Sequence, residues 1–298
     1  MSSHRDTYRA SCTGFRAGFM APPAMRQVRV RDRRATAQVG RHARLELVFA
    51  VRDGRTVLTH SYAEPPFRPG RWFAEGSGLH MILASSSPGV FGGDVLDQSV
   101  VVEEGASVRL TSQSAPQLHP SASGATARVR SSYRVAAGAR LSCHWDASIP
   151  FAGACLDQRI EVDVAGGAEL YWSDAMMGGR DARGERWRFS SIAHELRICR
   201  AGALAYLERF RIAPADRSLS HPWIAGEATF FGTALAAGAV QTLPGEAERV
   251  HTMLNAIEGV RGAADTLDES FLVVRLMGKS SVPFHEARAR VREMLTHS

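Results

Sequence analysis

The stretch Val101-Val-Glu-Glu-Gly105-Ala-Ser-Val-Arg-Leu110 decides the fold, because it recurs along the chain. Three copies follow it, the last of them the loosest: Val135-Ala-Ala-Gly138-Ala-Arg-Leu141, Val164-Ala-Gly-Gly167-Ala-Glu-Leu170 and Cys199-Arg-Ala-Gly202-Ala-Leu-Ala205. The four glycines recur roughly every 30 residues, a period that marks stacked supersecondary units, none of which can bury its apolar face alone.

Each copy predicts a turn between two extended runs. Glycine adopts positive φ at no steric cost, and the small alanine that follows lets the next strand start close by. We therefore interpret each unit as a hairpin. The side chains three and five residues after the glycines are apolar, which predicts one shared buried face: Val108, Leu141, Leu170 and Ala205, then Leu110, Cys143, Trp172 and Leu207. The side chains six residues after the glycines are polar, and we call them the polar column: Thr111, His144, Ser173 and Glu208.

The sequence divides the chain into three regions, and the repeats lie in the second of them. Residues 1–40 form an arginine-rich tail that we expect to be disordered, since residues 1–44 hold ten arginines against two aspartates. Residues 41–243 are predicted to be a body of successive strands. Residues 244–298 are predicted to be a small α/β segment packed on that body, with helices over 244–257 and 281–295 and a strand over 270–277. The expected fold is mainly β: a stacked β-hairpin or β-solenoid-like body with two helices and a strand near the C-terminus.

The charge distribution argues against a nucleic-acid partner. The net charge is +6, but the excess lies in the tail, whereas nucleic-acid binding favours basic residues on a folded face. No apolar run reaches the roughly 18 residues that a membrane helix needs. We find no secretion signal either. The sequence therefore predicts a cytoplasmic protein with no nucleic-acid or membrane partner.

The titratable residues form no catalytic or metal-binding motif of known spacing, such as HxxxH or HExxH. His144 and Asp146 come closest, because two residues apart on one strand they share a face. A glycine-rich loop follows His80 and contains Gly93, Asp94 and Asp97, without the Lys-Ser/Thr of a nucleotide site. These groups suit a borderline divalent ion such as nickel or zinc, or are hydrogen-bonded strand residues. We predict no tight metal site and no tightly bound cofactor.

A β-solenoid carbohydrate-active enzyme is the alternative. Such an enzyme uses two carboxylates about 5–10 Å apart. The aspartates that could stack on adjacent turns are Asp146, Asp157, Asp163 and Asp174. The body lacks the clustered aromatic residues that bind sugar rings, and no nucleophile elbow of the G-x-S-x-G type is present. The sequence places polar residues in register but contains no recognisable set of catalytic residues. This favours binding or scaffolding over catalysis.

Five motifs occur in a characteristic order. They are Leu45-Glu-Leu-Val-Phe with Arg52-Asp-Gly-Arg; Gly92-Gly93-Asp94-Val-Leu-Asp97 leading to Gly105-Ala; Leu110-Thr-Ser-Gln113-Ser-Ala-Pro116; Ser148-Ile-Pro-Phe-Ala-Gly-Ala154; and Gly178-Gly-Arg180, Ala182-Arg-Gly-Glu185 and Phe189. With these five motifs in this order, the chain resembles the urease accessory proteins of the UreD (UreH) family over about residues 44 to 295.

The resemblance implies a non-enzymatic maturation factor for urease. A protein of this family bridges apo-urease to a UreF-type accessory protein, which recruits a UreG-type GTPase carrying nickel. The resemblance further implies that nickel passes transiently through an internal, water-filled channel. We expect the polar column and two neighbours to line that path: Thr111, Gln113, His144, Asp146, Ser173 and Glu208.

Overall fold

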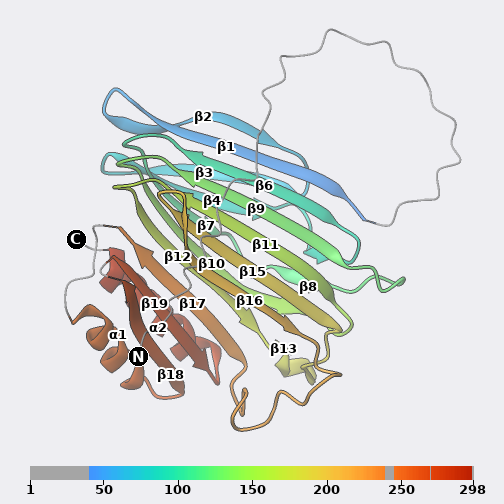
Figure 1. Ribbon diagram of the computed structural model, residues 1–298. Helices are drawn as coiled ribbons and strands as arrows, with labels where there is room; N and C mark the ends of the chain where they lie inside the picture. Colours follow the sequence, from blue (N-terminus) through green and yellow to red (C-terminus); the bar gives the residue numbers. More distant parts are fainter. Residues whose placement is uncertain (1–39, 239–244, 269, 297–298) are drawn as a thin grey trace, which may run out of the picture.

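The protein is a two-layered β structure in the computed structural model, which describes residues 40–238, 245–268 and 270–296. Figure 1 shows two large sheets packed face to face, with both helices beside the C-terminal strands. The predicted mainly β, solenoid-like fold is confirmed. The predicted disordered tail lies outside the described residues, apart from Gly40. Among the described residues, no helix is long and apolar enough to cross a membrane.

Seven strands form the first sheet, in the order β16 (Ala203–Ile212), β15 (Ser191–Arg200), β11 (Cys155–Val164), β9 (Ala127–Val135), β6 (Val95–Val102), β1 (His42–Arg52) and β2 (Arg55–Ala63). The main path of the second sheet is β18 (Val260–Asp268), β19 (Phe271–Gly278), β17 (Phe230–Ala237), β12 (Glu169–Met177), β10 (Arg140–Pro150), β7 (Ser107–Ser112), β4 (Gly78–Ser85) and β3 (Phe67–Glu75). The short strands are β5 (Val90–Phe91), β8 (Gln117–His119), β13 (Gly179–Arg180) and β14 (Glu185–Arg186), with a 3-10 turn, η1 (Asp181–Arg183), between the last two.

The first three glycine turns carry the chain from one sheet to the other. Gly105, Gly138 and Gly167 have φ of +70°, +66° and +75°. Strands that enter these turns pair in parallel with one another in the first sheet, and strands that leave them pair in parallel in the second. The prediction of hairpins is therefore wrong for these three units. Each unit is one coil of a stack, and its two strands depend on the neighbouring coils for their hydrogen bonds.

The fourth turn is a true hairpin. Ala201 and Gly202 have φ of +46° and +80°, and β15 pairs antiparallel with β16 across them. Two positive φ values in a two-residue loop are what a type I′ turn requires. The register then shifts between Ile198 and Cys199, where Ala205 is an extra residue of β16. The inward-facing side chains of β16 are therefore Tyr206 and Glu208, both buried, whereas Leu207 is 44% exposed. The predicted burial of Leu207 is wrong, because a shift of one residue moves every side chain of a strand to the opposite face.

The predicted apolar registers of the first three units are confirmed. Leu141 lies opposite Val108 and Leu170, and Cys143 opposite Leu110 and Trp172. All six side chains are at most 2% exposed and belong to one cluster between the sheets. This cluster occupies the part of the sandwich next to the glycine turns.

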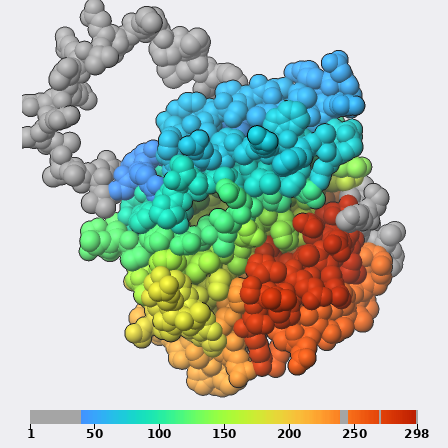
Figure 2. Space-filling view, turned by 180° about the vertical axis from the view of Figure 1, so that it is seen from behind, coloured from blue at the N-terminus to red at the C-terminus, as the bar shows by residue number. Residues whose placement is uncertain are grey.

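A second apolar cluster lies on the outer face of the second sheet. It joins α1 (Glu246–Asn255) and α2 (Ser281–Thr296) to β12, β17, β18 and β19. Both helices agree with the sequence prediction within a few residues, and the predicted strand over 270–277 is β19. Strand β18 was not predicted. Figure 2 shows this C-terminal region, in orange and red, lying directly against the green strands of the stacked body.

Candidate functional site: a polar cavity between the sheets

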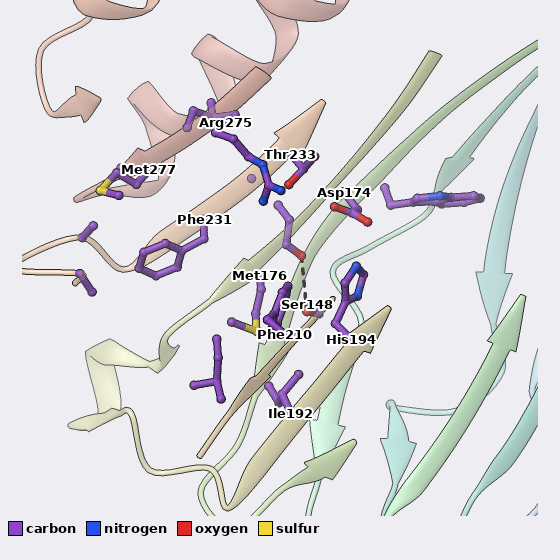
Figure 3. Close-up of a pocket in the computed structure, with 18 of the residues that line it drawn as sticks. Ser148, Asp174, Met176, Ile192, His194, Phe210, Phe231, Thr233, Arg275 and Met277 are labelled. Carbon is purple, nitrogen blue, oxygen red and sulfur yellow. Dashed lines mark hydrogen bonds between the residues drawn. The ribbon is translucent and has the colours of Figure 1, made fainter. Parts of the chain in front are cut away.

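The interior of the sandwich changes character along the strands. Next to the glycine turns it is filled by the apolar cluster, but towards the opposite ends of the strands it opens into a cavity of about 1810 Å³. Strands of both sheets line this cavity (Figure 3). Residues between 219 and 228, in the connection from β16 to β17, line it as well. The change follows from the sequence, since the inward positions of several strands are polar in this half.

Paired polar side chains line the cavity on the first sheet. Gln98 donates a hydrogen bond from Nε2 to the hydroxyl of Tyr133 (2.6 Å). His194 contacts the Oε1 atom of Gln158 through Nδ1 (3.1 Å) and stacks on Phe210, with ring centroids 4.9 Å apart. Each polar group thus has a partner on a neighbouring strand, which is what burial of polar groups requires.

A network around Glu208 connects the two sheets. Its Oε1 accepts a hydrogen bond from Nη1 of Arg275 (2.7 Å), and its Oε2 accepts one from the hydroxyl of Tyr206 (3.1 Å). Arg275 also donates from Nη2 to the Tyr206 hydroxyl (2.7 Å). Burial, and then the charge of Glu208, raise the pKa of Tyr206. The network connects β16, the edge strand of the first sheet, to β19 of the second.

Two further carboxylates face the cavity from the second sheet. Asp174 accepts a hydrogen bond from Nε1 of Trp172 (3.1 Å), and Asp146 accepts one from the hydroxyl of Ser112 (3.0 Å). Neither forms an ion pair with a basic side chain of the described residues. With Glu208 neutralised by Arg275, these two carboxylates make this part of the cavity wall negative and favourable for a cation.

A β-bulge places Asp146 in the cavity. The register of β10 against β12 shifts between His144 and Ala147. Asp146 lines the cavity, whereas His144 faces α2 on the other side of the sheet, with its ring stacked over Tyr171. The prediction that these two side chains share a face is wrong, because the extra residue of a bulge reverses the alternation of the strand.

The predicted polar column is partly assembled. Thr111, His144 and Ser173 do lie in one row across β7, β10 and β12. That row is on the outer face of the second sheet, whereas Glu208 faces the cavity from the first sheet. The four residues therefore do not form one column, because the fourth unit is a hairpin. Gln113 is exposed, so of the six residues expected along the path only Asp146 and Glu208 line the cavity.

The residues of the glycine-rich loop have structural partners. Asp94 is 1% exposed and accepts hydrogen bonds from the guanidinium of Arg41 (2.7 Å) and the backbone N–H of Phe91 (2.9 Å). Gly93 forms the preceding turn with φ of +93°, and Asp97 is exposed. His80 lies outside this loop on β4, where its Nε2 contacts the hydroxyl of Thr111 (2.9 Å).

Two of the sequence motifs, 148–154 and 178–189, meet beside Phe91 and His119, which lie outside the motifs. His119 lies between the rings of Phe91 (4.5 Å between centroids) and Phe151 (4.4 Å). The guanidinium of Arg180 lies 3.8 Å from the centre of the Phe151 ring and is held by Glu185. Motifs far apart in the sequence therefore contact one another, which accounts for their residue types without a catalytic role.

The aspartate stack of the carbohydrate-active alternative is wrong. Asp146 and Asp174 line the cavity from the second sheet. Asp157 and Asp163 belong to β11 of the first sheet, whose cavity-facing positions are Leu156, Gln158 and Ile160. Asp157 is paired with Arg130 (2.8 Å). The four carboxylates thus do not lie on adjacent turns of one face.

Several cavity residues were not identified from the sequence. Thr233 lies on β17, which pairs with β12 and was not predicted. Arg275 lies on β19, whose pairing with β17 was not predicted. His194 carried a usable signal, since it interrupts an apolar register formed by Ile192, Leu196 and Ile198. A polar residue in such a register faces the interior and marks a polar cavity or a buried hydrogen bond.

The cavity can accommodate a hydrated cation without fixing it. Among the described residues, no three side chains of the His, Cys, Asp or Glu type come together as a metal site. Asp146, Asp174 and His194 offer separate oxygen and imidazole groups along the wall. Separate groups of this kind hold a borderline divalent ion weakly.

Comparison with known proteins gives one consistent result. The family model described as UreD urease accessory protein matches residues 41–298. A urease accessory protein UreD of Sorangium cellulosum is 34% identical over 66% of this chain and 62% of its own length. The UreD of Acetivibrio thermocellus is 29% identical over 86% of this chain and 98% of its own length, and that of Deinococcus radiodurans 31% over 65% and 69%.

Proposed function

This chain belongs to the UreD urease accessory protein family, and from that premise we propose that it is a non-enzymatic maturation factor that helps to insert nickel into apo-urease. In this role it acts as a scaffold that connects apo-urease to a UreF-type protein and, through it, to a UreG-type GTPase. Nickel is the cargo, and it passes through the cavity between the sheets.

The cavity is the observation that carries this proposal. Its volume of about 1810 Å³ far exceeds that of a packing defect, and two carboxylates in its wall, Asp146 and Asp174, form no ion pair with a basic side chain of the described residues. Asp146 and Asp174 are partly buried, and two nearby carboxylates without a direct counter-ion make the wall attractive to a passing cation. Widely separated ligands suit transit, because a tight site would retain the ion.

A pull-down tests the scaffold. The full chain is incubated with UreF-type protein and apo-urease, separately and together. We expect both to be retained. Failure to retain either partner would contradict the scaffold role, whatever the cavity does.

A pair of matched variants tests the cavity. Asp174→Asn removes a charge inside the cavity, and Asp163→Asn removes the same charge from an exposed position of β11. Urease is matured in a reconstituted mixture, and its nickel content is measured by mass spectrometry. We expect Asp174→Asn to lower the rate of nickel incorporation about tenfold, as the loss of one charge-based interaction implies, with partner binding retained. Equal rates for both variants would contradict passage through the cavity.

A further inference from the structure

Buried polar atoms without hydrogen-bond partners gather on the outer face of the second sheet. They are Nε and Nη1 of Arg288, Nδ1 of His144, the hydroxyl of Tyr171 and Nε of Arg109. They account for five of the seven such atoms among the described residues. Because buried polar groups are almost always satisfied, a concentration of unsatisfied ones indicates a missing partner.

One stripe of α2 and two strands bring these groups together. His285, Arg288 and Arg292 are spaced three and four residues apart, so they share one face of the helix. On the sheet, Arg109 pairs with Ser142 in a row next to that of His144. We call the set formed by Arg109, His144, Tyr171, His285, Arg288 and Arg292 the α2 seam. Figure 2 shows the region where the C-terminal segment, in red, meets the green strands.

Arg288 is the centre of the α2 seam. It is 1% exposed, and its Nη2 donates to the backbone carbonyl of Trp145 (2.7 Å) and to the hydroxyl of Ser173 (2.9 Å). These contacts fix the guanidinium while leaving its two other nitrogens unbonded. A side chain held in this way has little conformational entropy left to lose when it binds a ligand.

The positive charge of the α2 seam is only partly compensated, because Arg288 and Arg292 have no direct counter-ion among the described residues. No carboxylate of the described residues forms an ion pair with Arg288 or Arg292. Glu75 pairs with Arg109 at the exposed side. Asp146 and Asp174 act on Arg288 electrostatically, but they line the cavity and accept hydrogen bonds there. Burial, followed by the charges of Arg288 and Arg292, lowers the pKa of His144 to about 3, so His144 is neutral.

We propose that the α2 seam binds a small inorganic oxyanion of the phosphate or sulfate type, held by Arg288, Arg109 and Arg292. An oxyanion accepts several hydrogen bonds at once, so it satisfies Nε and Nη1 of Arg288 together. Water would satisfy the same donors but would leave a buried positive charge without a direct counter-ion, which is costly. The near-complete burial of Arg288 favours a small free anion over one attached to a larger molecule. This inference does not depend on the proposed transit of nickel.

Isothermal titration calorimetry of the full chain with inorganic phosphate tests the proposal, with sodium chloride at matched ionic strength as the reference. We expect saturable binding of phosphate, and an affinity about tenfold lower in Arg292→Gln and in Arg109→Gln. Arg290→Gln is the matched control, because Arg290 lies on the same helix, is exposed and pairs with Glu286. We expect it to bind phosphate like the unaltered protein.

Three results would overturn the proposal. One is the absence of saturable phosphate binding, in which case water satisfies the donors. Another is an equal loss of affinity in Arg290→Gln and Arg292→Gln, which would indicate nonspecific attraction to the helix. The third is tighter binding of adenosine monophosphate than of phosphate, which would place the anion on an accessible surface. Thermal unfolding of each variant, followed by circular dichroism, shows that the compared proteins are folded.

Discussion

Replacing Arg275 with methionine removes the cation that pairs with Glu208 and thereby tests how the two sheets are held together. Glu208 is 8% exposed, whereas the side chain of Arg275 is 52% exposed. Loss of one partner from a fully buried pair costs about 3–5 kcal/mol, and an exposed pair contributes about 0–1 kcal/mol. This pair is intermediate, so we expect Arg275→Met to lower the free energy of unfolding by about 2 kcal/mol.

A double-mutant cycle separates the pair from other effects of the substitution. Glu208→Gln keeps an acceptor for Tyr206 and Thr233 but removes the charge. We expect this variant to lose about 1 kcal/mol, and the double variant to lose about 2 kcal/mol, so that the coupling energy is about 1 kcal/mol. Urea unfolding followed by tryptophan fluorescence measures all four free energies. A coupling energy below about 0.3 kcal/mol would refute the inference that this pair connects the sheets.

Three more predictions concern the stack itself. Gly138→Ala should lower the free energy of unfolding by about 1 kcal/mol, because alanine is strained at φ of +66°. Gly166→Ala is the control: a Cβ at that position would meet no atom within 4 Å and φ is not positive, so the same urea titration should show almost no change. Leu141→Ala should cost about 2–5 kcal/mol by thermal or urea unfolding, because it leaves a cavity between the sheets, and a cost below about 1 kcal/mol would contradict its packing. Burial alone would raise the pKa of Asp94, but hydrogen bonds from Arg41 and Phe91 hold it below the ordinary 3.8. The stability that Asp94 contributes is therefore present above pH 3.8 and is lost as the pH falls through the lowered pKa. We expect Asp94→Asn to flatten the acid limb of a curve of unfolding free energy against pH.

The repeat predicted the buried positions but not the pairing of the strands. Val108, Leu141 and Leu170 were identified because strand alternation fixes which side chains share a face. A glycine turn, however, can close a hairpin or carry the chain to another sheet. That choice depends on the hydrogen bonds available in neighbouring units, which a local pattern does not contain.

The candidate site depended on two local irregularities that the sequence did not reveal. The bulge after His144 directs Asp146 into the cavity, and the register shift opposite Ile198 and Cys199 directs Glu208 inward. The bulge in β10 and the extra residue Ala205 in β16 each change the alternation by one residue, so a prediction based on fixed offsets assigns the wrong face beyond that point. Cavity residues such as Arg275 needed knowledge of which strands become neighbours, since they meet Glu208 only through tertiary packing.

The antiparallel pairs that flank the stacked coils have a consequence for solubility. A row of parallel strands could in principle continue from one molecule to the next, because each free edge offers unpaired backbone groups to another chain. In the first sheet the row is flanked by the hairpins β1–β2 and β15–β16, and in the second by β3–β4 and by β17, β19 and β18. The edge strand β16 also carries outward-facing Arg209 and Arg211. These strands act as caps against end-to-end polymerisation, so truncation of β18 and β19 would expose β17 and invite fibre formation.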